Sequence, residues 1–143
     1  MQENKFLRHT LAALAYRTTK ALDGAPDSFA TFRPAPDSRT PVEILAHMGD
    51  LFDWAFHLSQ GEPAWNNSTP LAWPAEQERF FAALKRFDSC LVSTEPLKAD
   101  PERLLQGPIA DALTHVGQLT QVRRLAGSPI RGENYFKAEI KAL

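Results

Sequence analysis

The sequence has little of what would cross-link a protein, anchor it in a membrane or attract nucleic acid. Cys90 is the only cysteine, so the chain cannot form an internal disulfide. No run of residues approaches the stretch of about 20 apolar side chains that a membrane-spanning helix needs. The formal net charge of -1 argues against a basic surface for nucleic acid or anionic lipid. The first residues, 1–5, do not resemble a cleavable signal, and we expect a cytoplasmic protein that binds neither membrane nor nucleic acid.

The composition is that of an ordinary globular protein. With 143 residues, 43% of them hydrophobic and 23% charged, the chain is long enough to bury one substantial core. No linker and no internal repeat divides it. We therefore expect a single domain over residues 1–143. Cys90 falls in helical register with Leu84 and Phe87, which favours a packed thiol over a catalytic nucleophile.

Apolar residues recur at helical spacing in the first half of the chain. One amphipathic segment spans residues 5–22 and is followed by Gly24, a helix stop. A second is expected from Pro41 to about residue 60. It opens with Thr40 as a hydroxyl cap and Glu43 as the acid of a capping box.

The second half of the chain predicts two more helices. One begins at Pro74 and ends near residue 93, and the other begins at Pro108 and ends at Gly127. Between them we expect at most a short turn at residues 101–105. A final segment, residues 133–142, is predicted as a short helix that closes one end of the assembly.

These segments together predict an all-α fold, a four-helix bundle. Strand-like alternation does not persist for more than a few residues. The connections are long enough to cross over, so an up-down-up-down path is not required. Trp65 and Trp73 lie in the connection between the second and third helices, where we expect them to cap an end of the bundle.

Two polar residues on the fourth predicted helix suggest a metal site. Asp111 and His115 are four residues apart, beside an inward face that includes Leu119. Burying such groups without partners costs roughly 2–7 kcal/mol each. His47 is predicted to point inward from the second helix. Two imidazoles and a carboxylate, with a fourth position left open, are typical of a catalytic divalent-metal site, and zinc, nickel and iron(II) all accept these donors.

A reading without metal explains the same residues. Asp111 is near the start of its helix, where a carboxylate is favoured by the helix dipole. It is also placed to form an ion pair with His115 one turn later. Spacing alone leaves both interpretations open.

Three further residues are candidates for the surroundings of such a site. Asp50, one turn beyond His47, is placed to accept a hydrogen bond from an imidazole or to serve as a base, although an edge or surface position fits it better. Trp54 is a candidate pocket wall or a plain core residue. Gln118, one turn past His115, is equally consistent with orienting a bound ligand and with helix packing.

Most of the chain resembles the DinB/YfiT-like family. The segment from Asp111 to Gln118, Asp-Ala-Leu-Thr-His-Val-Gly-Gln, resembles the last bundle helix of that family, which usually carries His-x-x-x-His-x-Gly-Gln. The Arg-Leu-Ala-Gly-Ser-Pro that follows, residues 124–129, matches the usual helix end. The segment around His47 is similar to the other histidine helix of the family, and the order of these segments matches.

The resemblance implies a four-helix bundle with a three-histidine divalent-metal site, often in a homodimer. Members with known activity include thiol S-transferases that use low-molecular-weight thiols and an isomerase that acts on a thiol adduct. His47 and His115 match two histidine positions of the family, but Asp111 stands where the third usually is. This aspartate either alters the choice of metal or activity, or marks a member that has lost the metal.

Two functions remain in competition at this point. The first is a divalent-metal-dependent enzyme that activates a water molecule or a low-molecular-weight thiol toward a small-molecule substrate, as a thiol S-transferase or a hydrolase. The sequence identifies no second nucleophile, so any catalysis would depend on the ion. The second is a non-catalytic bundle that binds a small apolar ligand or a partner without metal.

Overall fold

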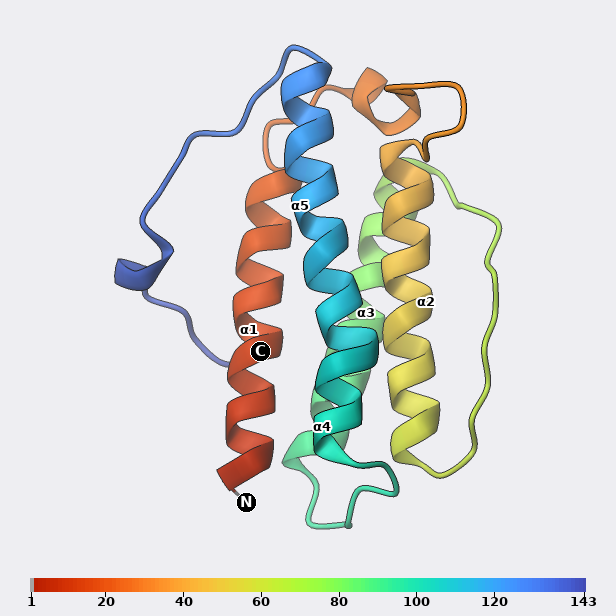
Figure 1. Ribbon diagram of the computed structural model, residues 1–143, viewed down its shortest axis with the longest axis vertical. Coiled ribbons are helices and arrows are strands. Elements are labelled where there is room, and N and C mark those ends of the chain that lie inside the picture. The colour runs from red at the N-terminus through yellow and green to blue at the C-terminus, as the bar shows by residue number, and fades with distance from the viewer. Residues whose placement is uncertain (1) are drawn as a thin grey trace.

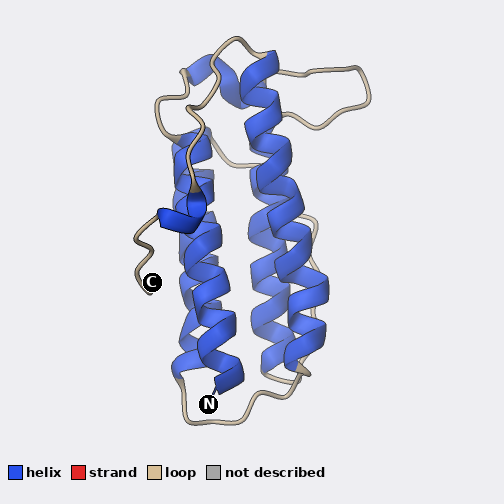
Figure 2. Ribbon diagram, turned by 60° about the vertical axis from the view of Figure 1, so that its left-hand side comes forward, coloured by secondary structure: helices blue, strands red, loops and turns tan. Residues whose placement is uncertain are grey.

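The computed structural model describes residues 2–143, with side chains from residue 4 onward, as a bundle of long helices. They are α1 (Gln2–Leu22), α2 (Pro41–Ser59), α3 (Trp73–Val92) and a fourth that ends with α5 (Ala110–Leu125) (Figures 1 and 2). No strand occurs in residues 2–143, so the predicted all-α fold is confirmed. Within these residues, no helix is both long and apolar enough to cross a bilayer.

The helices follow an up-down-down-up path. α1 and α5 run in one direction and α2 and α3 in the other (Figure 1). A parallel pair needs a connection that travels the length of the bundle, and residues 60–72 form this crossover beside α2. The long connection predicted between the second and third helices therefore serves as a crossover that lies against one helix.

The core lies where the four helices meet. α1 and α2 each pack against both α3 and α5. The side chains at the centre are large and almost inaccessible to solvent: Leu11, Leu14, Phe29, Leu45, Met48, Phe52, Phe80, Leu84, Phe87, Leu104, Ile109 and Leu119. Phe29 comes from η1 (Asp27–Thr31), a short 3-10 helix that follows α1. Cys90 is half-buried on α3.

The start and end of α2 follow the signals in the sequence. The Thr40 side chain accepts a hydrogen bond from the Glu43 N–H, and the Glu43 carboxylate accepts one from the Thr40 N–H at 2.9 Å. This is the capping box that the sequence predicted. Gly61 follows the helix with a φ of 76°, a conformation that glycine adopts without strain.

The fourth helix begins earlier than Pro108, where the sequence placed its start. It starts at Pro101 with α4 (Pro101–Leu104) and continues into α5 through η2 (Leu105–Ile109), a π-helical turn. Pro108 has no N–H to donate, and in a regular α-helix its ring would clash with the carbonyl group four residues earlier. The wider π-helical turn accommodates the proline, so the helix continues where a break was predicted.

The predicted C-terminal helix over residues 133–142 is wrong. Only η3 (Tyr135–Lys137), one 3-10 turn, forms there, and the segment runs along the outside of the bundle (Figure 2). Its contacts with α1 are few: the Tyr16 hydroxyl donates to Glu133 at 2.7 Å, and the Tyr135 ring lies edge-on to Tyr16 with centres 6.2 Å apart. The Phe136 side chain is 96% exposed. A short helix is marginal without an apolar face to bury, and no residue of η3 is fully buried.

Candidate metal centre

Three side chains from two helices meet in the middle of the bundle's length. His47 comes from α2, and Asp111 and His115 come from adjacent turns of α5. Their donor atoms all lie within 4.8 Å of one another. His47 Nε2 is 3.2 Å from Asp111 Oδ2, and the two imidazole ring centres are 4.6 Å apart. The three residues that the sequence proposed as metal ligands are therefore brought together.

The backbone of α5 sets the orientation of His115. Its Nδ1 is 2.6 Å from the backbone carbonyl oxygen of Asp111, one turn earlier. This carbonyl can only accept, so Nδ1 carries the proton and Nε2 presents a lone pair. Metal-ligating histidines are usually held in this way, with one ring nitrogen bonded to a carbonyl or carboxylate. The lone pair of the second nitrogen faces Arg39 at 3.3 Å, so a cation bound there would replace that contact.

The spacing of the donors fits a divalent ion. A tetrahedral ion with bonds of about 2.1 Å separates its ligands by roughly 3.4 Å. The 3.2 Å between His47 Nε2 and Asp111 Oδ2 is close to this value. The donor atoms all lie within 4.8 Å of one another, so the widest pair would have to approach by at most about 1.4 Å. The cluster can therefore hold a metal ion through two nitrogens and one oxygen.

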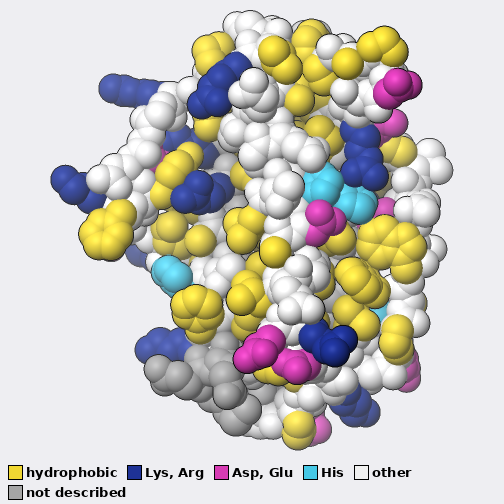
Figure 3. Space-filling view, in the orientation of Figure 1, with side chains coloured by type: hydrophobic (Ala, Val, Ile, Leu, Met, Phe, Trp, Pro, Cys, Tyr) yellow, Lys and Arg dark blue, Asp and Glu magenta, His cyan; other side chains and the backbone are white. Residues whose placement is uncertain are grey.

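The cluster lies at the edge of the core and is open on one side. The His115 side chain is 8% exposed and that of His47 18%, whereas that of Asp111 is 44% exposed. Figure 3 shows neighbouring histidine side chains on this face, with acidic and basic side chains beside them. A small molecule can thus reach the cluster from solvent without a change in the bundle.

Trp65 from the crossover forms a wall of the site. Its ring lies edge-on to His47, with centres 5.8 Å apart, and also edge-on to Trp54, at 5.6 Å. The expectation that Trp65 caps a bundle end is wrong, because the crossover lies along α2 and carries this residue to mid-bundle. Trp73 packs against Phe29 at 6.0 Å, away from the histidines.

Asp50 does not join the cluster. It is buried on α2, and its carboxylate accepts hydrogen bonds from the Ser68 N–H at 2.9 Å and the Ser68 hydroxyl at 2.6 Å. It also accepts a bond from Arg79 at 3.2 Å. The edge or surface position favoured from the sequence is wrong, because the crossover and α3 cover this face of α2. Asp50 fixes the crossover next to the site.

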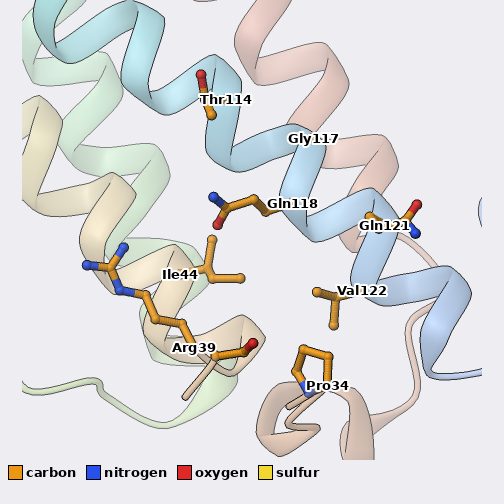
Figure 4. A pocket seen from close by; sticks show the side chains of 9 residues that line it. Pro34, Arg39, Ile44, Thr114, Gly117, Gln118, Gln121 and Val122 are labelled. Atoms are coloured by element: carbon orange, nitrogen blue, oxygen red, sulfur yellow. The ribbon is translucent and has the colours of Figure 1, made fainter. Parts of the chain in front are cut away.

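Gln118 and the unpredicted Arg39 lie on the far side of the cluster from Trp65. Gln118 is exposed and lines an open cavity of about 650 Å³ between α2 and α5 (Figure 4). Arg39 lines the same cavity, and one of its terminal nitrogens is 3.3 Å from His115 Nε2. Arg39 is 76 residues from His115 in the sequence and precedes the α2 cap, where no helical periodicity signals its role.

His47 has a pKa below its ordinary value of 6.5. Burial is the largest cause, because it disfavours the charged imidazolium. The hydrogen bond to Asp111 acts in the opposite direction, and the positive charge of Arg39 lowers the pKa further. His47 is therefore held neutral at pH 7, the form in which it can ligate a metal.

This shift predicts a pH-dependent stability of the metal-free protein. In the unfolded chain His47 takes up a proton near pH 6.5, whereas in the folded chain it resists protonation until lower pH. The unfolded state thus binds more protons in this window, so the free energy of unfolding falls as the pH drops below about 6.5.

Urea unfolding at pH 8, 6.5 and 5.5 measures this dependence. As the pH falls, the free energy of unfolding of the variant His47→Gln should decrease less than that of the unmodified protein, by up to about 1.4 kcal/mol per pH unit. Parallel pH profiles for the two proteins would contradict the assignment.

Comparison with known proteins gives one family match. The model of the DinB superfamily matches residues 10–127, a range that includes His47, Asp111 and His115. No curated protein and no solved structure matches the chain.

Proposed function

The chain belongs to the DinB superfamily, and from this premise we propose that it is a divalent-metal-dependent enzyme. His47, Asp111 and His115 hold the ion, and a water molecule or a low-molecular-weight thiol is activated there toward a small-molecule substrate. The observation that supports this most strongly is the convergence of their donor atoms, from two helices, within 4.8 Å at a solvent-accessible edge of the core.

The bound ion supplies Lewis acidity, which lowers the pKa of a thiol or water molecule and makes it nucleophilic near neutral pH. The protein supplies the orientation. The Asp111 carbonyl fixes His115, and burial keeps His47 neutral. Trp65 shields one side of the cluster from water, while the cavity beside Arg39 leaves the other side open to a substrate.

Asp111 gives this site a different charge from one built only of histidines. A carboxylate adds one negative charge and a hard oxygen donor. Its 44% exposure leaves it in contact with solvent at the mouth of the site. Zinc, nickel and iron(II) all accept two nitrogens and one oxygen, and we propose one of these as the resident ion.

Metal analysis of the protein tests the proposal. The chain is purified without an affinity tag that binds metal and without chelator, and its metal content is measured by mass spectrometry. We expect about one equivalent of a divalent metal per chain, as the one three-donor cluster found among residues 4–143 implies. Metal-free protein that also fails to take up zinc, nickel or iron(II) during dialysis would refute the proposal.

The choice between thiol transfer and hydrolysis is tested with the loaded protein. An electrophile such as 1-chloro-2,4-dinitrobenzene is offered with and without a small thiol, and a panel of esters and amides is offered with water alone. Metal-dependent consumption of the thiol supports transfer. Metal-dependent ester or amide cleavage supports hydrolysis, and no turnover in either assay argues for the non-catalytic alternative. A homodimer remains a prediction that light scattering checks.

A further inference from the structure

We propose that the open cavity beside the metal centre binds an organic carboxylate and that Arg39 is its anion-binding residue. This inference rests on the proposed function, because it concerns the substrate that would react at the metal. Binding itself is measurable without the metal.

The cavity adjoins the cluster directly. It measures about 650 Å³, within the range of small-molecule sites, and lies between α5 and the start of α2. Arg39 lines it and also contacts His115 Nε2 at 3.3 Å. A molecule seated against Arg39 therefore has its other atoms close to the donor atoms of the metal centre.

The guanidinium group of Arg39 has donors to spare. An arginine carries five N–H donors, and Arg39 directs one terminal nitrogen at His115. Among residues 4–143, no carboxylate forms an ion pair with it, whereas the neighbouring Arg33 pairs with Glu43 at 3.2 Å. Arg39 is exposed, so a ligand can approach it from solvent. Two parallel N–H groups of a guanidinium match the two oxygens of a carboxylate.

The charge of the occupied site also favours an anion. Histidine ligates a metal as a neutral imidazole, so His47 and His115 would add no charge to an occupied site, and an ion on His115 Nε2 would replace the contact that Arg39 makes there. The single negative charge of Asp111 does not balance a divalent cation together with the positive charge of Arg39. The other acids close by already have partners: Glu43 pairs with Arg33, and Asp50 pairs with Arg79. A substrate carboxylate supplies the missing negative charge.

The other residues that line the cavity indicate the chemistry of the rest of the ligand. Ile44 and Val122 form an apolar side of the cavity, and the amide of Gln118 extends from α5 into the space between the helices (Figure 4). Such a lining fits a small molecule with an apolar body, one polar group and a carboxylate. Phenylacetate is a suitable probe, and phenylacetamide has the same shape without the charge.

Calorimetric titration of the two probes tests the inference. Both are titrated into metal-free and zinc-loaded protein, and into the variants Arg39→Gln and Arg39→Lys. Arg103→Gln is the matched control. Arg103 lines a separate cavity of about 350 Å³, beside Trp54, that shares no lining residue with the cavity at Arg39. Zinc uptake is measured on the same samples, and circular dichroism confirms that each variant is folded.

We expect metal-free protein to bind phenylacetate about tenfold more tightly than phenylacetamide, as a charge-assisted bond at an accessible site implies. Arg39→Gln should abolish this difference, Arg39→Lys should keep part of it, and Arg103→Gln should leave it unchanged.

Equal affinities for the two probes, absence of binding of both, or an unchanged preference in Arg39→Gln would overturn the inference. Failure of zinc uptake together with a preference that depends on Arg39 would refute the metal enzyme and leave the carboxylate site standing. The two failures are thus distinguishable.

Discussion

Replacing His115 with alanine is expected to lower the affinity of the protein for a divalent metal by more than a hundredfold. Loss of even an outer partner of a ligand typically costs 10–100-fold in metal affinity, and His115 is placed as a ligand itself. Its Nε2 faces the cluster because Nδ1 is bound to the Asp111 carbonyl. His47→Ala should have an effect of similar size, since it removes the donor that α2 contributes.

Competition with a coloured zinc chelator measures these affinities. His57→Ala is the matched control, because His57 is on the same helix as His47, about three turns further on, and outside the cluster. Circular dichroism and urea unfolding confirm that the variants are folded. If His115→Ala and His47→Ala bind zinc as tightly as His57→Ala does, Asp111 and His115 form a structural ion pair that needs no metal.

Asp111→Ala separates the carboxylate from the imidazoles in the same assay. The side chain is removed, while the backbone carbonyl that orients His115 remains. The carboxylate also accepts a hydrogen bond from His47 at 3.2 Å. Its removal therefore takes away one candidate metal ligand and the hydrogen bond that holds a second one, His47. The zinc affinity of Asp111→Ala, measured by the same competition, therefore tests the aspartate as a ligand.

The second large effect is expected at Arg79, which neutralises acids buried between α2 and α3. Arg79 binds Glu76, whose side chain is inaccessible to solvent, at 2.6 Å, and binds Asp50 at 3.2 Å. It also donates to the Ala46 carbonyl at 2.7 Å, where it lies against Gly49. Arg79→Met should lower the free energy of unfolding by about 3–5 kcal/mol, because it leaves buried carboxylates without a counter-charge.

Arg86→Met is the control for this prediction. Arg86 pairs with Asp53 at 2.8 Å, but both side chains are accessible to solvent, so its loss should cost less than about 1 kcal/mol. Urea unfolding of the metal-free proteins at pH 7.5 gives both values. Equal losses for the two variants would show that the buried network contributes no more than a surface ion pair.

The same network connects stability with the candidate site. Asp50 holds Ser68, and the crossover that contains Ser68 also carries Trp65 to His47. Loosening Asp50 by removing Arg79 should therefore shift the tryptophan fluorescence of the folded variant toward that of solvent-exposed indole. The fluorescence of Arg86→Met should stay unchanged.

Much of the fold was predictable because its signals are local. The apolar spacing of α1, α2 and α3 depends on the period of a helix, and the Thr40–Glu43 capping box depends on four consecutive residues. The sequence predicts a fourth helix that is too short, because proline commonly marks the first turn of a helix and here lies inside it. The helix predicted over residues 133–142 does not form, because this segment packs only lightly on α1 and η3 has no fully buried residue.

The candidate ligands were predictable for a similar reason. Asp111 and His115 are one turn apart on one helix, so their proximity follows from helical geometry alone. His47 required the further inference that α2 and α5 face each other, which its predicted inward position suggested and the resemblance to a known family supported. The family match confirms that resemblance.

Trp65, Arg39 and the buried Asp50 were not predictable in their roles. Each lies in or against a connection without periodicity, and their positions depend on where the crossover and the loop before α2 settle on the bundle.

The sequence by itself determined α1, α2 and α3, the cap of α2 and the pair of donors on α5, because these depend on residues within one or two turns of each other. The tertiary structure alone decided which helices run parallel, which face of α2 is covered, and which tryptophan and arginine border the histidines. Those features arise from contacts between residues tens of positions apart, and such contacts leave no periodic trace in the chain.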